Sequence, residues 1–328
     1  MSAELQAGRH GAPLVIDQVH KRFTQGRRVA HILRGCSLTI GAGEIVALVG
    51  ESGSGKSTLA RTIMKLYTPD EGKLLFGSED VTHAKGKALR QYRERVQMVF
   101  QDPFASLNPA HSIRTILRRS LPPSARHYSE RQREDLFDEV LTQVGLTPAS
   151  NFLQQFPHEL SGGQRQRVAL ARSLAGRPDL VLADEPVSML DVSLRLGVLN
   201  LMLSLNERFG IGYLYITHDL ASARYVASRI AVMYAGEIVE EGPAEAIVEE
   251  AKHPYTQLLV QAAPDPDRRG LQELDESVFT GEPPDLSREI QGCPFQFRCP
   301  HVMEKCYESS PPLKDLGNGQ KVKCFLAE

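Results

Sequence analysis

Residues 50–57 read GESGSGKS, a run of glycines and serines that ends on a cation and a hydroxyl group. Glycine has no Cβ, so a loop built around Gly50, Gly53 and Gly55 can wrap closely and direct several backbone N–H groups at one point. Such a point attracts anions. The spacing fits a phosphate cradle in which Lys56 reaches the β- and γ-phosphates and the Ser57 hydroxyl binds Mg²⁺. The residues assigned to this phosphate loop are Gly50, Glu51, Ser52, Gly53, Ser54, Gly55, Lys56, Ser57 and Thr58.

A phosphate loop requires a strand before it and a helix after it. Residues 44–49, EIVALV, form a short apolar run typical of a buried strand, and residues 58–66, TLARTIMKL, space apolar side chains as a helix does. The start of that helix adds the positive end of its dipole to the site. We therefore predict a triphosphate site here, against the alternative of a glycine-rich turn that happens to precede a lysine.

Two carboxylates end the run LVLADE at residues 180–185. A buried strand would deliver Asp184 and Glu185 to the C-terminal edge of a parallel sheet, where ligands bind. Asp184 suits Mg²⁺, and Glu185 could polarise an attacking water. The alternative is that the two acids cap the next helix. Together with a phosphate loop, they predict hydrolysis of a phosphoanhydride.

A third element, LSGGQ, occupies residues 160–164. Ser161 can cap a helix whose first amides Gly162 and Gly163 expose, which makes a second anion site; alone, the pattern is an ordinary helix start. With the two preceding elements, residues 12–260 resemble the nucleotide-binding subunit of an ABC transporter. The resemblance implies that Ser161, Gly162, Gly163 and Gln164 close over the γ-phosphate held by a second subunit, so that two head-to-tail domains enclose two ATP molecules.

The same resemblance implies roles for five further residues. Glu185 is the general base. Gln101, in VFQDP, contacts Mg²⁺ and the attacking water, and His218, in YITHD, reaches the γ-phosphate. Asp191, in SMLD, belongs to the loop that communicates across the dimer, and Phe23, in HKRF, stacks on adenine. As bare residues, Gln101 would be a surface amide, His218 a structural histidine and Phe23 a core aromatic.

The elements that must position these residues follow from the alternation of apolar runs and helical patterns between about residues 12 and 245, which is typical of an α/β sheet. We expect the mixed-sheet core and helical subdomain of an ABC-type P-loop NTPase, followed by a small cysteine-containing C-terminal domain. The predicted bounds are 12–262 for the ATPase domain, about 102–175 for its helical subdomain and 263–328 for the extension. Strands are predicted at 14–19, 44–49, 96–100, 180–183, 212–217 and 229–233, and helices at 56–66, 130–144, 162–175 and 193–209.

The composition restricts the partners and the compartment. The chain has 328 residues, of which 41% are hydrophobic and 24% charged, with a net charge of -2. This balance gives no basic footprint for nucleic acid. No run approaches the roughly 18 apolar residues of a spanning helix, and the first residues lack the apolar core of a signal peptide. These features indicate a cytoplasmic protein whose membrane role depends on a partner, and the resemblance to ABC transporters implies a peripheral place at the cytoplasmic face of the inner membrane.

Three segments resemble the oligopeptide, dipeptide and nickel importer branch: HPYTQLLVQAAP at 253–264, FASLNP at 104–109 and PHELSGGQRQRVALAR at 157–172. This resemblance implies import of peptides or related solutes such as nickel chelates. It implies as partners a second ATPase subunit, which we expect to be a different chain in a heterodimer rather than a second copy, two membrane permease subunits and an extracytoplasmic solute-binding protein. The alternatives are a non-transport ABC ATPase and a regulatory module that binds ATP without turnover.

Four of the five cysteines lie in the C-terminal region with the spacing C-x5-C-x6-C-x17-C. Cys293, Cys299, Cys306 and Cys324 suit a [4Fe-4S] cluster, which similar tails of this branch are expected to carry. Zn²⁺ is the alternative, although the close cysteine pairs usual for zinc are absent; unligated or disulfide-bonded cysteines are a third. His301 is a candidate substitute ligand, against the favoured alternative of a lone exposed histidine, and Cys36, in the run RGCSLTI, is predicted to be a small buried hydrophobe.

Overall fold

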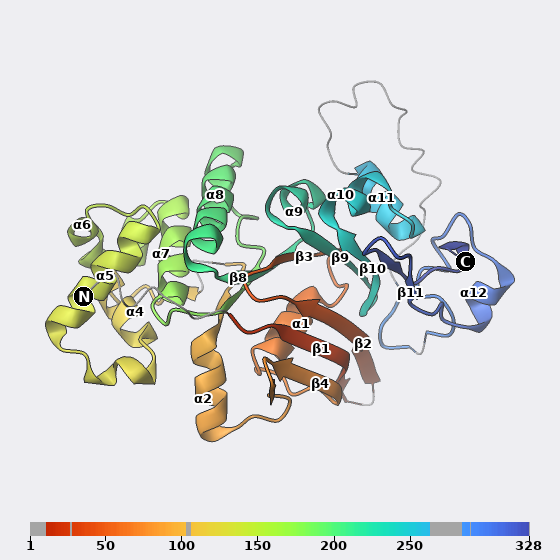
Figure 1. The fold of residues 1–328 in the computed structure, drawn as a ribbon, viewed down its shortest axis with the longest axis horizontal. Coiled ribbons are helices and arrows are strands. Elements are labelled where there is room, and N and C mark those ends of the chain that lie inside the picture. The colour runs from red at the N-terminus through yellow and green to blue at the C-terminus, as the bar shows by residue number, and fades with distance from the viewer. Residues whose placement is uncertain (1–10, 27, 103–105, 263–283, 289, 328) are drawn as a thin grey trace. The chain divides into compact units, whose positions relative to one another are not determined.

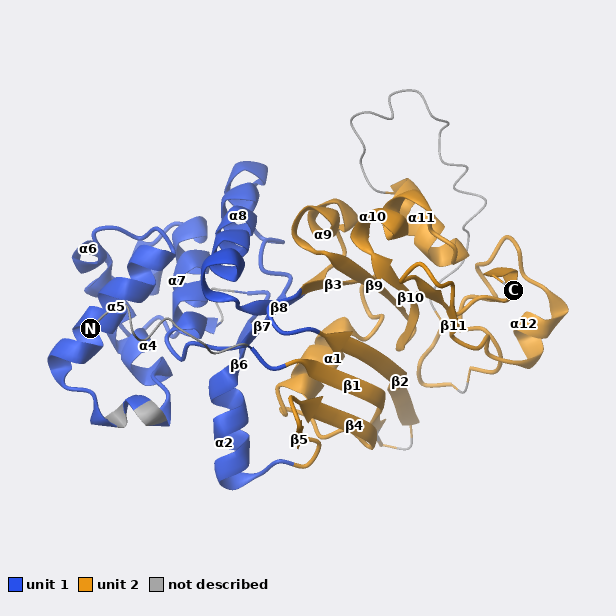
Figure 2. Cartoon of the chain, viewed as in Figure 1, with its two compact units in different colours: residues 1–12, 41–44, 84–214 blue, residues 13–40, 45–83, 215–328 orange. Residues whose placement is uncertain are grey.

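The structure, a computed structural model, describes residues 11–26, 28–102, 106–262, 284–288 and 290–327. The first residues of FASLNP and the end of the 253–264 segment lie outside the described residues. The chain forms two compact units, coloured separately in Figure 2. Unit 1 comprises residues 1–12, 41–44 and 84–214, and unit 2 comprises residues 13–40, 45–83 and 215–328.

Unit 2 contains an antiparallel sheet of four strands in the order β2-β1-β4-β5. These strands are β1 (Leu14–Gln25), β2 (Arg28–Ile40), β4 (Glu71–Phe76) and β5 (Glu79–Asp80). The buried side chains alternate along β1, where Leu14 and Ile16 are almost fully buried. Such alternation is expected of a sheet that packs one face against a core.

Unit 2 also holds the strand that leads to the phosphate loop and the next two strands of the same sheet. The parallel strands β3 (Ile45–Val49) and β9 (Arg229–Tyr234) pair directly, and β10 (Glu237–Pro243) pairs antiparallel to β9. All five residues of β3 are buried, as expected of a parallel strand covered on both faces. The helices of this unit are α1 (Lys56–Ile63), α9 (Leu220–Val226), α10 (Ala244–Glu249), α11 (Pro254–Ala262) and α12 (Glu304–Glu308).

The C-terminal segment is joined to β10 by three buried carboxylates. β12 (Lys321–Val322) pairs with β10 and with β11 (Lys314–Asp315). Lys323 and Lys321 form ion pairs with Glu237 and Glu241, at 2.9 and 2.8 Å. Glu240, which is fully buried, accepts hydrogen bonds from the Gln320 side chain and from two backbone N–H groups. The glutamates of β10 tolerate burial because each has partners, of which the tail supplies two ammonium groups and one amide.

Unit 1 combines a helical region with parallel strands. β6 (Val96–Val99) pairs with β7 (Leu180–Asp184), and β8 (Gly212–Thr217), within which the chain passes into unit 2, follows in the sheet order. Its helices, seen on the chain trace in Figure 1, are α2 (Gly86–Arg95), α4 (Ile113–Ser120), α5 (Glu130–Gln143), α6 (Ala149–Leu153), α7 (Gly162–Leu174) and α8 (Val192–Phe209). Short 3-10 turns occupy Pro123–His127 and Pro157–Glu159, and in unit 2 Phe325–Ala327.

The predicted α/β class is confirmed, and each of the six predicted strands and four predicted helices has a counterpart whose ends lie within three residues of the prediction, except that β1 runs to Gln25 instead of ending at residue 19. The segment 253–264, whose pattern is that of an amphipathic helix with an N-terminal proline, contains α11, whereas the sequence pattern missed β2, β4, β5, β10, β11, β12, α2, α6, α9, α10 and α12. No helix in the described residues is both long and apolar enough to cross a bilayer. Residues 284–327 belong to the same compact unit as the phosphate loop, so a separate domain at 263–328 stays a prediction.

Candidate functional site

The phosphate loop has the flanks that the sequence predicts, β3 before it and α1 after it. Gly55 adopts a φ of 109° at the start of α1, a conformation that a residue with a Cβ rarely reaches, and Gly53 adopts a φ of 82°. Lys56 is 5% exposed, and its ammonium donates to the carbonyl oxygens of Gly50 and Glu51, at 2.7 and 2.8 Å. The cation is thus held inside the loop at the N-terminus of a helix, where anions are stabilised.

Two residues that the sequence reasoning missed hold the second residue of the loop. The Arg298 guanidinium contacts both carboxylate oxygens of Glu51, at 2.8 and 2.9 Å. The backbone N–H of Glu51 donates to the Tyr255 hydroxyl at 2.8 Å. The pair raises the pKa of Arg298 above its ordinary value. Tyr255 lies in the segment HPYTQLL and Arg298 in the segment CPFQFRC, but neither sequence pattern predicts a contact with the phosphate loop.

His218 and Phe23 also belong to unit 2. His218 is exposed directly after β8, as expected for a side chain that reaches a ligand at the end of a strand. Phe23 is half-buried on β1; it packs against Tyr67 in a T-shaped arrangement with ring centroids 5.0 Å apart, and the Lys21 ammonium lies 5.4 Å from the Phe23 ring centroid. The ring is therefore not a core residue, and its role in binding adenine stays a prediction.

In unit 1, the structure brings Gln101 and Glu185 together. The Gln101 amide donates to a carboxylate oxygen of Glu185 at 2.8 Å. Asp184 is the last residue of β7 and is 3% exposed. Glu185 has a φ of 47°, in the left-handed region where a non-glycine residue is strained. Such strain concentrates at functional sites, and here it turns the chain sharply after the buried aspartate.

LSGGQ begins α7 through a reciprocal cap. The Ser161 hydroxyl accepts from the Gln164 N–H at 3.3 Å, and the Gln164 side chain accepts from the Ser161 N–H at 2.9 Å. The predicted cap is therefore confirmed, and Gly162 and Gly163 form the first turn. Asp191 similarly caps α8 by accepting from the Leu194 N–H at 3.0 Å. These contacts fix the start of both helices and leave the predicted role in a second subunit untested.

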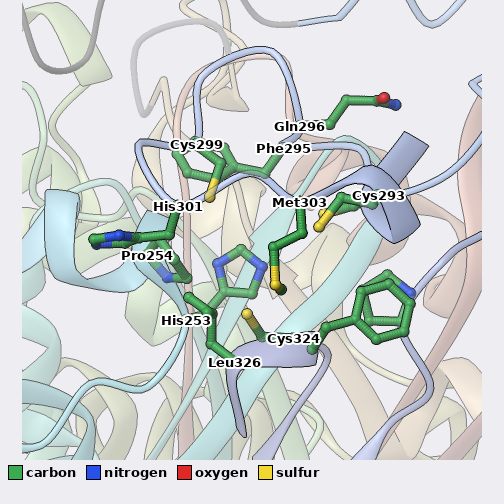
Figure 3. A pocket seen from close by; sticks show the side chains of 13 residues that line it. His253, Pro254, Cys293, Phe295, Gln296, Cys299, His301, Met303, Cys324 and Leu326 are labelled. Carbon is green, nitrogen blue, oxygen red and sulfur yellow. The ribbon is translucent and has the colours of Figure 1, made fainter. Parts of the chain in front are cut away.

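The four C-terminal cysteines line one pocket, shown in Figure 3. The labelled side chains of Cys293, Cys299 and Cys324 point into it together with Met303. Cys306 is the fourth cysteine of this lining. The other lining residues are mainly apolar or aromatic: His253, Pro254, Phe295, Gln296, His301, Pro311, Phe325 and Leu326. All five cysteines of the chain are free, which excludes disulfides in this structure. Cys36 is buried as predicted and donates to the Gly236 carbonyl at 2.9 Å.

Burial in the pocket disfavours the deprotonated form of its cysteine side chains. Burial raises the pKa of Cys293 to about 12 and raises the pKa values of Cys299 and Cys324. A bound cation would reverse this preference, since metal coordination deprotonates thiols. Among the described residues, no group of three or more histidine, cysteine or carboxylate side chains is placed to hold a metal ion.

Comparison with known proteins identifies two regions. Residues 33–188 match the family model described as ABC transporter, and residues 239–306 match that described as Oligopeptide/dipeptide transporter, C-terminal region. The oligopeptide transport ATP-binding protein AppF of Bacillus subtilis is 42% identical over 89% of this chain and 88% of its own length. A probable peptide ABC transporter ATP-binding protein of Sinorhizobium fredii is 41% identical over 91% of this chain and 83% of its own length.

Solved structures agree with this result. The ATP-binding cassette MJ0796, a dimer bound to ADP and Pi, is 31% identical; the match covers 70% of this chain and 98% of that one, with a TM-score of 0.63. The cassette cbiO1 of Clostridium perfringens is 26% identical over 73% of this chain and 92% of its own, with a TM-score of 0.65. The chain therefore belongs to the ATP-hydrolysing subunits of ABC transporters, with a C-terminal region of the oligopeptide and dipeptide type.

Proposed function

We propose that this chain hydrolyses ATP to power the import of peptides or closely related small solutes. The observation that carries the proposal is the joining of an ABC cassette at 33–188 to an oligopeptide/dipeptide C-terminal region at 239–306. Relatives at 42% and 41% identity are named for transport of oligopeptides and peptides. Nickel chelates are the alternative solutes.

The loop and the two carboxylates suggest how hydrolysis proceeds. Lys56 would exchange the carbonyls of Gly50 and Glu51 for the β- and γ-phosphates, stabilising the charge that develops during in-line attack. Glu185 would orient and deprotonate the attacking water, and Gln101, already hydrogen-bonded to it, would hold that carboxylate in place. His218 would contact the γ-phosphate. Bound Mg²⁺ neutralises phosphate charge, and Ser57, Gln101 and Asp184 carry the oxygen atoms suited to it.

A function in transport also implies that the chain assembles with other subunits. We propose that LSGGQ and Asp191 face a second ATPase subunit, that two permease subunits bind the pair at the cytoplasmic face of the inner membrane, and that an extracytoplasmic binding protein delivers the solute. The exposure of Met189 and Val192, at 56% and 73%, beside Asp191 supports an interface there. Because ATP binds the closed dimer better than the open one, closure can drive the permeases.

We further propose a [4Fe-4S] cluster held by Cys293, Cys299, Cys306 and Cys324. The fit rests on four free thiols lining one largely apolar pocket, the donor set that such clusters use. A single Zn²⁺ would need its four sulfur atoms about 3.8 Å apart, from Zn–S bonds of about 2.3 Å in a tetrahedron. The four thiolates of a cluster each bind a different iron and therefore lie further apart than the four ligands of a single ion.

Two experiments test the proposal. The ATPase is reconstituted with its second ATPase subunit and its permeases in lipid nanodiscs, where peptide-loaded binding protein should stimulate hydrolysis and a complex carrying Glu185→Gln should respond less; stimulation by nickel chelates alone would contradict peptide import. For the cluster, absorption spectra and iron, sulfide and zinc analysis are measured on protein purified without oxygen. About four irons per chain are expected. Cys306→Ser should lose them and Cys36→Ser should retain them, whereas one zinc per chain would refute the cluster.

A further inference from the structure

The phosphate loop is held from outside itself at Glu51. Its side chain binds the Arg298 guanidinium through two hydrogen bonds of 2.8 and 2.9 Å, and its backbone N–H donates to the Tyr255 hydroxyl. Its carbonyl oxygen accepts from Lys56 and from the N–H of Ser54. Every polar group of Glu51 thus has a partner, and this residue supplies one of the two carbonyl oxygens that hold the lysine cation.

Arg298 is itself rigidly placed. Its side chain is 9% exposed, and its guanidinium lies 5.8 Å from the ring centroids of both Tyr234 and Phe295. Tyr234, Tyr255 and Phe295 pack against one another with centroids 4.5 to 5.5 Å apart. A largely buried arginine that makes two hydrogen bonds holds a carboxylate more firmly than a lysine would, because the two hydrogen bonds fix the plane of the carboxylate.

The aromatic support also lines the cysteine pocket. Phe295 is 1% exposed and, with Cys293 and Cys299, forms part of the pocket lining. The turn that carries Arg298 is closed by a hydrogen bond from its own N–H to the Phe295 carbonyl, at 3.0 Å. Arg298 directly precedes Cys299. A displacement of residues 293–299 therefore displaces the guanidinium that binds Glu51.

We propose that Arg298 and Tyr255 are positioning residues for the nucleotide: from the C-terminal region they hold Glu51, and through it the Lys56 cation, in the geometry that binds the triphosphate. This inference rests on the proposed binding of ATP phosphates at residues 50–58. Because coupling between two sites is reciprocal, nucleotide bound in the loop also orders the cysteine-bearing segment. Residues 293–299 thereby act on ATP affinity without touching ATP.

Lys323 provides a matched control. Like Arg298 it is a basic residue directly before a cysteine of the pocket, and it pairs at 2.9 Å with a glutamate, Glu237, that is 7% exposed. Glu237 lies on β10 and not in the phosphate loop. Arg298→Met and Lys323→Met therefore each remove an ion pair directly beside a pocket cysteine. The Arg298 pair is bidentate, and Glu237 keeps Arg34 at 3.6 Å when Lys323 is lost, but only the Arg298 pair holds a residue of the loop.

The test measures binding of the non-hydrolysable analogue Mg-AMP-PNP to the full-length chain by calorimetry. Arg298→Met should raise the dissociation constant roughly tenfold to a hundredfold, the range found when a group that orients a ligand-binding residue is removed. Lys323→Met should leave it within about twofold, since it keeps the Glu51 contact. Arg298→Lys, which keeps the charge and loses the fork, should lie between them. Equal affinities for wild type and Arg298→Met, or equal losses in both methionine variants, would overturn the proposal.

Two further measurements separate positioning from mere stability. Tyr255→Phe removes only the hydroxyl that accepts from Glu51, so it keeps the test available where Arg298→Met does not fold, and it should weaken binding several-fold. Hydrogen exchange at residues 293–299 should slow on addition of Mg-AMP-PNP in wild type and in Lys323→Met but not in Arg298→Met. An exchange rate that nucleotide leaves unchanged in wild type would contradict the reciprocal coupling.

Failure of the underlying assignment gives a different result. Lys56→Ala should abolish binding of Mg-AMP-PNP. If Lys56→Ala binds as well as wild type, the loop does not hold the triphosphate, and the proposed function of the loop and this inference both fall. If only the Arg298 and Tyr255 variants bind as wild type does, the loop assignment stands and the positioning role is wrong.

Discussion

Replacing Gly50 by alanine tests whether the close approach of backbone to backbone, rather than glycine's conformational freedom, determines the shape of the phosphate loop. Gly50 follows β3, whose last residue Val49 pairs with Val232 of β9. A Cβ on Gly50 would lie 2.2 Å from the carbonyl oxygen of Met233, the next residue of β9. Because that atom is backbone within a buried sheet, no side-chain rotation relieves the contact.

The size of the effect follows from this distance. Cβ contacts below 3.0 Å are essentially never found, so the loop or β9 must move by about 0.8 Å. Overpacking of this kind costs about 1–3 kcal/mol of folding stability. A shift of about 1 Å in a positioned group costs on the order of a hundredfold in function. We therefore expect Gly50→Ala to weaken binding of Mg-AMP-PNP about a hundredfold while the chain still folds.

The assay compares calorimetric binding and thermal unfolding for wild type, Gly50→Ala and a control, Gly210→Ala. Gly210 ends α8 with a φ of 66° and has no atom within 4 Å of a built Cβ, so its alanine variant carries conformational strain without a clash. It should lose about 1–2 kcal/mol of stability and bind nucleotide normally. Wild-type affinity in Gly50→Ala, or an equal loss of affinity in both variants, would refute the steric argument.

Three further predictions concern catalysis, packing and pH. Glu185→Gln should lower the turnover of ATP on the order of a hundredfold or more while Mg-ATP still binds, which single-turnover assays check; unchanged turnover would exclude Glu185 as the base. Glu240→Ala removes the acceptor of two backbone N–H groups, those of Lys252 and His253, while the Gln320 amide keeps the Glu250 carbonyl; denaturant titration should show a loss of about 2 kcal/mol or more, and a loss below about 1 kcal/mol would contradict this reasoning. Burial, followed by the charges of Arg22 and His20, lowers the pKa of His31. The contribution of neutral His31 to stability is therefore complete above the ordinary histidine pKa of about 6.5 and falls as the pH decreases below it. His31→Gln should lose less stability between pH 7.5 and 5.5 than wild type does, and equal losses would contradict this prediction.

Local signals in the sequence predicted much of the cassette. The glycines and lysine of the phosphate loop lie within eight consecutive residues, so their own backbone conformations and the flanking apolar patterns indicate the site. Helix starts were equally readable, because Ser161 and Gln164 cap α7 across three residues and Asp191 caps α8 in the same way. The predicted bounds of α7 and α8 are accordingly right to within one residue.

Other parts of the fold depend on partners far away in the sequence. The run EIVEEGP of β10 reads as an exposed, acidic segment, yet six of its residues are buried. Its glutamates tolerate burial because residues 320–323, about 80 positions later, supply two ammonium groups and an amide. Periodicity within β10 contains no information on those partners, so the strand was missed.

The sequence by itself determined which residues could bind a triphosphate and which thiols could bind a metal group, since both depend on residue type and short spacing. Only the tertiary structure decided that the two regions are physically linked. Glu51 and Arg298 are 247 residues apart, and their contact arises because β3, β9 and the C-terminal segment fold into one compact unit. A contact of that range depends on the packing of buried aromatic rings around the ion pair, which residue spacing along the chain does not encode.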